Sequence, residues 1–191
     1  MNGFYERHAK RWLDFAFAAV AILCLSPLLI LTALIIRLQD GGPAIFRQVR
    51  VGREQQPFTI FKFRSMPVAT PHLASADARK VTITPFGRFI RRTNIDELPQ
   101  LFNILRGEMS LIGPRPALAS QAELLRMREA ARVMRARPGL TGLAQVNSYD
   151  GMTEADKVEW ERRYVERITL GVDASIVART FVYLLRPPPV Y

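Results

Sequence analysis

The sequence predicts an α+β fold that is mainly helical, with a Pro-broken membrane helix at its N-terminus and one small β-hairpin. Residues 15–36 carry no charged side chain, and residues 44–64 have the composition of two short strands. Further along, apolar residues recur at helical spacing between turns rich in Gly and Pro. The 191 residues suit one compact domain plus an appendage. We therefore expect a membrane-anchoring segment over residues 1–40 and a globular domain over residues 41–191.

The composition limits the possible functions. The chain has 27 Lys and Arg residues against 17 Asp and Glu residues, which gives a net charge of +10. Such an excess indicates nucleic acid, anionic lipid or phosphorylated substrates as partners. One Cys and two His residues exclude a disulfide framework and a thiolate zinc site. Of the basic residues 23 are Arg, whose guanidinium grips phosphate with two hydrogen bonds, although a GC-rich genome would produce the same bias.

The apolar segment is long enough to cross a membrane, which needs about 20 residues of helix. Pro27 lies in its middle and must kink the helix, while Ser26 can bond back to the preceding turn. Lys10 and Arg11 precede the segment and Arg37 follows it, so basic residues mark both flanks as cytoplasmic. We therefore expect a re-entrant helix that returns to its own side; a Pro-kinked spanning helix is the alternative.

After this segment, residues 44–51 and 57–64 are rich in Ile, Val, Phe and Thr and predict a hairpin. Residues 67–80 have the composition of a mobile loop. Helices are expected over residues 84–92, 93–106, 117–135, 154–167 and 173–185, several of them amphipathic and interfacial.

Two of these helices carry open questions. In the helix at residues 84–92, Phe86, Phe89 and Ile90 share one side and Arg residues the other, which fits either the headgroup layer of a membrane or an ordinary protein surface. The helix at residues 117–135 is strongly basic, and anionic lipid headgroups are its expected partner. Asp173 is the expected N-cap of the last helix.

The adjacent acids Asp96 and Glu97 are the first candidate for chemistry. They stand near a predicted helix N-terminus, where carboxylates are common because they complement the helix dipole. Two carboxylates this close can also divide their roles, with one attacking as a nucleophile and the other holding a divalent cation. A phosphate substrate would then require several cationic side chains nearby.

Such cations recur along the chain. Lys62 lies near the end of a predicted strand, and Arg91 lies just before the acidic pair. Arg115 and Arg137 each stand in a loop made rigid by Pro and Gly, GPRP and RPGLTG. Each of these residues taken singly is also explained as a solvated surface charge.

Several long motifs now combine. PFTIFKFRSM, DELPQLFNILRGEMSLIGPRP and RPGLTGLAQVN follow a helix interrupted by Ser-Pro, in that order. The chain thereby resembles the bacterial sugar transferases, and within them the small monotopic phosphoglycosyl transferases that consist of the catalytic domain only. The resemblance extends from about Tyr5 to Phe181.

The resemblance implies transfer of a phospho-sugar from a UDP-sugar to a polyprenol (undecaprenyl) phosphate with release of UMP, initiating glycoconjugate synthesis. It implies that Asp96 attacks the sugar-bearing phosphate and forms a covalent intermediate, and that Glu97 helps bind Mg²⁺. Residues near the phosphates would be Lys62, Arg91, Arg115 and Arg137.

The resemblance also implies a location. The membrane segment, interrupted at Ser26 and Pro27, would enter and leave at the cytoplasmic face of the bacterial inner membrane. Lys10 and Arg11 would contact lipid headgroups there. The catalytic domain over residues 41–191 would lie on that face, with interfacial helices around a cationic active site.

The chain departs from the family pattern in one loop. Leu143 stands where many members have Trp, and Asn147-Ser148-Tyr149 replaces Asn-Gly-Arg. The sugar, the glycan pathway and the oligomeric state stay open. A membrane-tethered basic binding protein or a scaffold without catalysis is the alternative function, and nucleic acid is not an expected partner because no nucleic-acid-binding motif is present.

Overall fold

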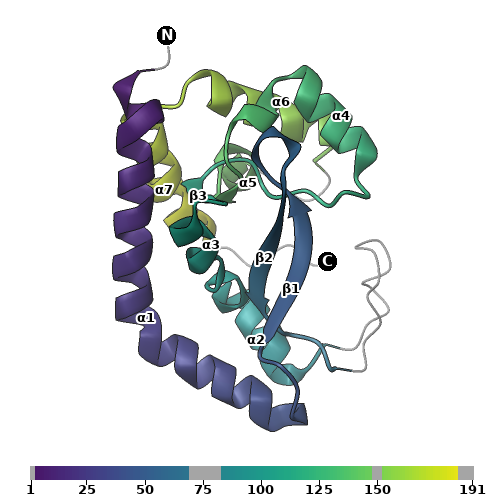
Figure 1. Ribbon diagram of the computed structural model, residues 1–191. Helices are drawn as coiled ribbons and strands as arrows, with labels where there is room; N and C mark the ends of the chain where they lie inside the picture. The colour runs from purple at the N-terminus through teal and green to yellow at the C-terminus, as the bar shows by residue number, and fades with distance from the viewer. Residues whose placement is uncertain (1–2, 69–82, 148–151, 185–191) are drawn as a thin grey trace.

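The computed structural model describes residues 3–68, 83–147 and 152–184. A long helix, α1, runs along one side of the molecule and a two-stranded hairpin along the other, with shorter helices between and above them (Figure 1). The loop expected at residues 67–80 lies almost entirely outside the described residues.

Helix α1 (Lys10–Asp40) follows a π-helical turn at Tyr5–Ala9 and ends at Gly41, whose φ of 71° allows the chain to leave the helix. Figure 1 shows the bend in its middle, where Pro27 lies inside the helix. The Ser26 hydroxyl donates to the Leu23 carbonyl at 2.8 Å, as expected. The helix stays continuous through the bend, so the predicted break is a kink in one helix.

By length and composition α1 is sufficient to cross a membrane, and only 17% of its most apolar window is buried in the protein. Both of its ends are tied to the globular part. Near the first end the Lys10 ammonium donates to the Asp173 carboxylate at 2.7 Å, and at the last turn Asp40 pairs with Arg64.

The placement of Lys10 and Arg11 does not support their expected contact with lipid headgroups. The Lys10 side chain is only 12% exposed and is bound to Asp173. The Arg11 guanidinium donates to the carbonyls of Ile104 and Leu105, at 2.6 and 3.0 Å, at the end of another helix. Both charges are therefore used within the protein, where they hold α1 to its neighbours.

The predicted hairpin is confirmed. Strands β1 (Ile45–Val51) and β2 (Pro57–Phe63) pair in antiparallel register, with Gln48 opposite Ile60 and Arg50 opposite Phe58. Residues two apart on one strand share a face of the sheet, and so do residues paired across the two strands. Arg50, Ile60 and Lys62 therefore point to the same side.

Helix α2 (Pro85–Arg92) begins as predicted, with the Thr84 hydroxyl accepting from the Gly87 N–H. The helix expected over residues 93–106 instead forms in two pieces. A 3₁₀ turn at Ile95–Glu97 precedes α3 (Gln100–Arg106), because Pro99 has no N–H to continue a helix through it. The acidic pair therefore lies in a 3₁₀ turn, which corrects the expected helix N-terminus.

The rest of the chain forms small elements around these. They are β3 (Ser110–Ile112), α4 (Ala122–Ala130), a 3₁₀ turn at Val133–Arg135, β4 (Gly139–Thr141), α5 (Leu143–Asn147), α6 (Glu154–Glu166) and α7 (Leu170–Leu184). The parallel pair β3–β4 was not predicted. The basic helix is shorter than predicted because Arg132, with φ of 56°, ends it. Asp173 lies inside α7 and is not its N-cap.

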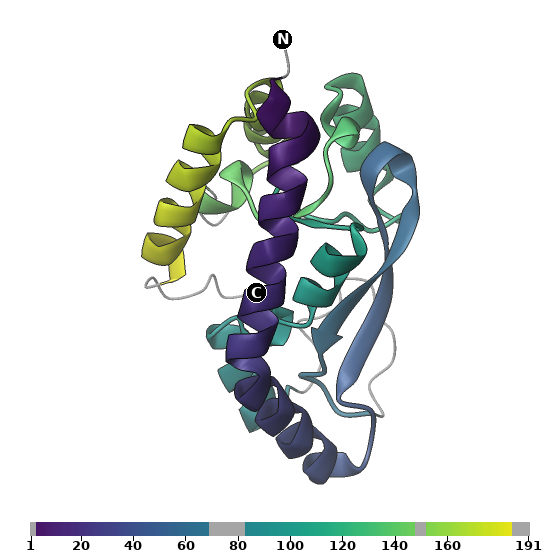
Figure 2. The same cartoon turned by 60° about the vertical axis from the view of Figure 1, so that its left-hand side comes forward.

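Three apolar clusters form the core. The largest joins α4, α6 and α7 and includes Tyr164 and Ile176. The second joins α1 to β2 and α3 through Ala18, Ile60 and Ile104. The third holds the part of α1 after the bend against β2 and α2 through Ile36, Phe63 and Ile90. Figure 2 shows α7 on one side of α1, and α3 and the hairpin on the other.

Candidate active site

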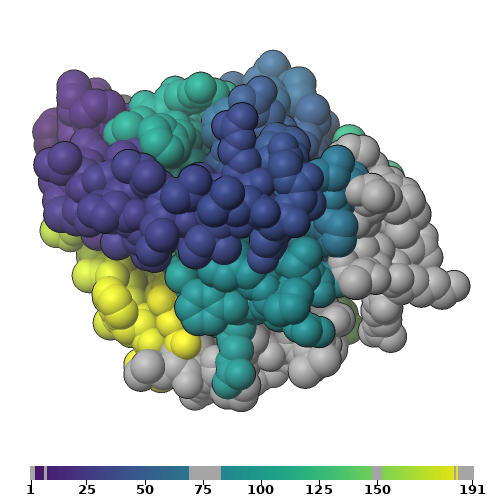
Figure 3. Space-filling view, turned by 90° about the horizontal axis from the view of Figure 1, so that it is seen from below, coloured from purple at the N-terminus to yellow at the C-terminus, as the bar shows by residue number. Residues whose placement is uncertain are grey.

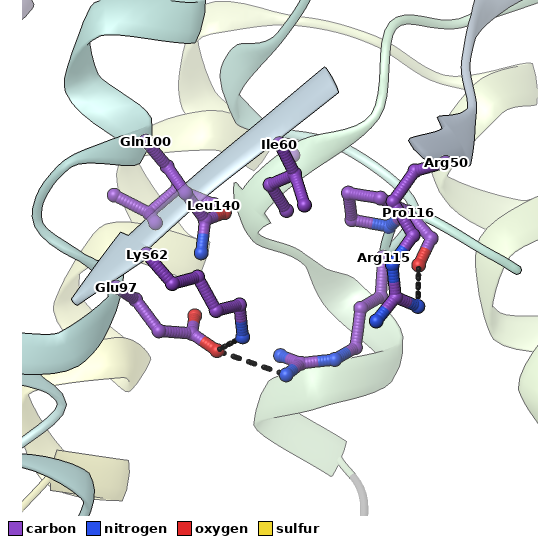
Figure 4. Close-up of a pocket in the computed structure, with 9 residues that line it drawn as sticks. Arg50, Ile60, Lys62, Glu97, Gln100, Arg115, Pro116 and Leu140 are labelled. Atoms are coloured by element: carbon purple, nitrogen blue, oxygen red, sulfur yellow. Dashed lines mark hydrogen bonds and ion pairs between the residues drawn. The ribbon is translucent and has the colours of Figure 1, made fainter. Parts of the chain in front are cut away.

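Glu97 is the centre of a cationic cluster. One of its oxygens, Oε1, accepts from the Lys62 ammonium at 2.7 Å and from the Arg115 guanidinium at 2.9 Å (Figure 4). Its side chain is 15% exposed, whereas that of Arg115 is 52% exposed. Lys62, Glu97 and Arg115 line a shallow hollow together with Arg50 and Gln100, which we call the cationic hollow.

Strand β2 and helix α3 fix the two sides of this hollow. Asn103, fully buried in α3, donates to the Thr59 carbonyl at 2.7 Å and accepts from the Phe61 N–H at 3.1 Å. A side-chain amide thus completes the free edge of β2, where an unpaired backbone group would be unfavourable. These two hydrogen bonds fix α3 against β2 and so set the distance between Lys62 on the strand and Glu97 just before the helix.

The loop that carries Arg115 makes close backbone contacts with the loop that follows Arg137. Gly113 donates to the Thr141 carbonyl at 2.9 Å, and Gly139 donates to the Pro114 carbonyl at 2.8 Å. A methyl group on Gly139 would collide with the backbone of Gly113, so the two loops approach as closely as they do only because both residues are glycine. The two rigid loops of the sequence are therefore neighbours.

A buried ion pair supports the same loop. The Arg128 guanidinium on α4 binds the Glu161 carboxylate on α6 through two hydrogen bonds, and their side chains are only 3% and 1% exposed. Glu161 also accepts a hydrogen bond from the backbone N–H of Arg115. Arg128 is therefore engaged in the interior, and it does not serve the lipid contact expected for the basic helix.

The two carboxylates have different acidities. Burial, followed by the neighbouring charge of Glu97, raises the pKa of Asp96 from 3.8 to about 6. Burial alone would also raise the pKa of Glu97, but the charges and hydrogen bonds of Arg115 and Lys62 outweigh it and lower that pKa to about 2. A pair separated in this way offers one permanently ionised carboxylate and one more basic, more nucleophilic carboxylate.

Arg91 and Arg137 lie on different sides. The Arg91 Nε–H donates to the Ser65 hydroxyl at 2.8 Å, and its charge acts on Asp96. The Arg137 Nε–H donates to the Gly107 carbonyl at 2.9 Å, at the end of α3. The structure thus brings Lys62, Arg91 and Arg115 to the acidic pair and places Arg137 with a helix C-terminus.

The sequence reasoning did not single out two residues of the hollow, Arg50 and Gln100. The hairpin register was the missing signal for Arg50, because it places that residue on the same face as Lys62. Gln100 follows Glu97 by three residues, a spacing that puts both on one side of a helical turn.

The carboxylates of the site fit Mg²⁺ only if substrate phosphates supply some of the oxygens around the ion. Among the described residues, no group of three or more acidic, His or Cys side chains is placed to hold a metal ion. Mg²⁺ is commonly bound by one or two carboxylates together with substrate phosphates. Glu97 and Asp96 could supply the carboxylate oxygens for such a shared site.

Comparison with known proteins identifies the family. The sequence profile described as "Bacterial sugar transferase" matches residues 5–187. The chain belongs to the bacterial sugar transferase family. The profile covers every residue of this transferase that forms the cationic hollow.

Three relatives indicate the range of the family. A UDP-glucose:undecaprenyl-phosphate glucose-1-phosphate transferase of Caulobacter vibrioides is 42% identical over 95% of this chain and 72% of its own length. The uncharacterized sugar transferase EpsL of Bacillus subtilis is 37% identical over 90% of this chain and 84% of its own length. An undecaprenyl-phosphate galactose phosphotransferase of Salmonella typhimurium is 36% identical over 97% of the present chain but only 42% of its own length.

Proposed function

We propose that this protein transfers a sugar-1-phosphate from a UDP-sugar to undecaprenyl phosphate and releases UMP. The observation that carries the proposal is the placement of the acidic pair among cations: Glu97 is bound by Lys62 and Arg115, and the neighbouring Asp96 lies within the influence of the same charges. Relatives named as glucose and galactose phosphotransferases to undecaprenyl phosphate support the substrate class without distinguishing the sugar.

The reaction proceeds in two displacements. In the first, a carboxylate oxygen of Asp96 attacks the phosphorus that bears the sugar, and the bond from that phosphorus to the bridging oxygen breaks. The bridging oxygen keeps the electron pair and leaves as part of UMP. In the second, a phosphate oxygen of the lipid attacks the same phosphorus, and the Asp96 carboxylate is released. Lys62 and Arg115 offset the negative charge of the substrate at this place.

Glu97 is the proposed ligand of Mg²⁺, and the ion would neutralise phosphate charge when bound. Replacement of Glu97 by Gln should therefore raise the Mg²⁺ concentration needed for half-maximal UMP release. Unchanged Mg²⁺ dependence in that variant would argue against this role.

The apolar surface supports a location at the membrane. In Figure 3 the bent arm of α1 lies across one face, with α2 and the end of α7 beside it. Exposed apolar side chains come from all three helices, among them Leu34, Leu38, Phe89 and Phe181, each at least 52% exposed. A continuous surface of this kind is typical of a membrane or protein contact.

The ties at both ends of α1 favour the re-entrant arrangement, and we place the globular body at the cytoplasmic face because basic residues flank the apolar segment on both sides. A helix held at each end by one globular body is difficult to reconcile with a crossing that leaves that body on one side. We expect tags at Met1 and Tyr191 to be reached by labelling reagents only from the cytoplasm. A tag at Met1 that is reached from the periplasm would refute this topology.

The covalent step has a direct test. Wild-type protein in lipid nanodiscs should exchange labelled UMP into a UDP-sugar with Mg²⁺ and without any lipid acceptor. Asp96→Asn should abolish both this exchange and UMP release, whereas Asp156→Asn, an exposed acid on α6, should preserve both. Turnover without acceptor-independent exchange would indicate a single displacement, and wild-type turnover in Asp96→Asn would refute the nucleophile.

A further inference from the structure

Two buried hydrogen-bond donors in the cationic hollow have no acceptor among the residues that the structure describes. They are the Nε–H of Arg50 and the side-chain N–H₂ of Gln100, and both residues line the hollow. Gln100 is only 2% exposed, and Figure 4 shows its amide directed into the space beside Lys62. Buried donors are normally paired, and an unpaired one is unfavourable.

The remaining contacts of Arg50 hold it in this position. One terminal nitrogen donates to the Pro116 carbonyl at 3.3 Å and the other to the Gln48 side chain at 2.5 Å. The guanidinium is therefore fixed between its own strand and the loop of Arg115. Its Nε–H is the donor that those contacts leave over.

The charge of the hollow favours an anion. Arg50, Lys62 and Arg115 contribute three cations, and the carboxylate of Glu97 already serves two of them. Burial and the charge of Arg115 lower the pKa of Arg50, against the opposing charge of Glu97. A fixed excess of positive charge beside two unpaired donors is a site for phosphate oxygens.

The cations form two overlapping groups around the acidic pair. Lys62, Arg91 and Arg115 are the positive charges that act most strongly on Asp96. Arg50 lines the cationic hollow with Lys62, Glu97 and Arg115, and its charge is coupled to Arg115 and Glu97. Lys62 and Arg115 therefore belong to both groups, whereas Arg91 acts on Asp96 without lining the hollow and Arg50 lines the hollow. A diphosphate has two phosphate groups to distribute over such an arrangement.

We infer that Arg50 and Gln100 bind the phosphate of the departing UMP, so that they form the leaving-group site of the enzyme. This inference rests on the proposed function, which places the attacked phosphate next to Asp96. When the bond to the bridging oxygen breaks, its electron pair stays on UMP, and the charge of that phosphate increases. The two unpaired N–H groups donate to its oxygens, and no proton is transferred.

The two half-reactions give the test, because UMP takes part only in the first. Gln100→Leu removes one donor at similar volume, and Arg50→Lys keeps the charge but removes the Nε–H. Each variant should bind UMP at least about tenfold more weakly by calorimetry and slow acceptor-free UMP exchange by a similar factor. Arg126→Lys, at an exposed arginine paired with Glu123, is the matched control and should change neither value.

The second half-reaction is measured separately. Protein preloaded with labelled phospho-sugar is freed of UMP and mixed with undecaprenyl phosphate. Both variants should transfer the label at the wild-type rate. Equal slowing of this step would overturn the inference, because the two residues would then serve the lipid phosphate.

Direct UMP binding separates this inference from the proposed function. Wild-type protein that shows no exchange would refute the covalent mechanism, whatever the variants do. Wild-type exchange combined with unchanged UMP affinity in both variants would refute only the leaving-group site. Circular dichroism and thermal unfolding check that each variant keeps the fold, and if one variant fails to fold the other carries the test.

Discussion

Asp96→Asn should make the protein more stable at neutral pH. The folded state raises the pKa of Asp96 from 3.8 to about 6, so ionisation of this carboxyl favours the unfolded chain. That difference corresponds to about 3 kcal/mol once the pH is above both values. A neutral Asn avoids this cost, because it resembles the protonated carboxyl in shape and charge.

The sign and the pH window follow from the same shift. Below pH 3.8 the carboxyl is protonated in both states, so the substitution gains nothing. Between about pH 4 and 6 the unfolded state ionises first, and the advantage of Asn grows. Above about pH 6 it is constant. The gain in unfolding free energy should therefore be about 3 kcal/mol at pH 7.5 and well under 1 kcal/mol at pH 4.

Equilibrium unfolding by guanidinium in a mild detergent measures this difference at the two pH values. A parallel thermal scan at pH 7.5 should show an increase in Tm of about 6–12 °C for a chain of this size. Glu129→Gln, at an exposed carboxylate on α4, is the matched control and should stay within about 0.5 kcal/mol of wild type.

Two results would refute the reasoning. Equal or lower stability of Asp96→Asn at pH 7.5 would mean that the carboxylate is not destabilised in the fold. A gain that persists unchanged at pH 4 would mean that the variant is stabilised by something other than the removal of charge. Neither readout involves turnover, so the electrostatics of the site are tested apart from its chemistry.

Three further predictions concern the supports of the site. Glu161→Gln leaves the buried charge of Arg128 unpaired and should lower the free energy of unfolding by about 3–5 kcal/mol, most of which the double change Glu161→Leu with Arg128→Met should recover. A loss below about 1 kcal/mol would contradict the importance of the pair. Replacing Ser26 by Leu and Pro27 by Ala should straighten α1 and so lengthen the distance between spin labels at its two ends, measured in a cysteine-free background. An unchanged distance would show that packing, and not Pro27, imposes the bend. Gly139→Ala should reduce both stability, by about 1–3 kcal/mol, and UMP release, because its methyl group collides with the facing loop; wild-type activity would show that the two loops can separate.

The sequence was informative where a local rule decides the structure. Alternating β-branched and aromatic residues fixed the hairpin, and Pro27 fixed the bend of α1. The helix expected over residues 93–106 is divided in the structure, because Pro99 lies inside that range and has no N–H to continue a helix. Its effect is local, so the rule that explains the 3₁₀ turn was already available from the sequence.

Other features depend on contacts between distant segments. The three-residue strands β3 and β4 are too short for a periodic pattern, and their pairing emerges only when two Gly-containing loops meet. Lys10 reads as a membrane flank in the sequence, yet its partner Asp173 lies 163 residues away. Single-sequence patterns contain no signal for such a pair, and the same holds for Arg137 and the Gly107 carbonyl.

Two supports of the site and the cationic hollow differ in how their buried polar groups are paired. In two supports of the site the buried groups are paired: Asn103 completes the edge of β2, and Arg128 is matched by Glu161. Around the cationic hollow the balance is different, because Asp96 is held at a raised pKa and donors of Arg50 and Gln100 are left unpaired. Evolution tolerates such local costs where a ligand removes them on binding. A diphosphate has two charged groups, one to lie beside Asp96 and one to accept from Arg50 and Gln100. The stability of Asp96→Asn therefore measures the cost of the site without a ligand, and the UMP affinity of the Gln100 variant measures what the ligand gains there.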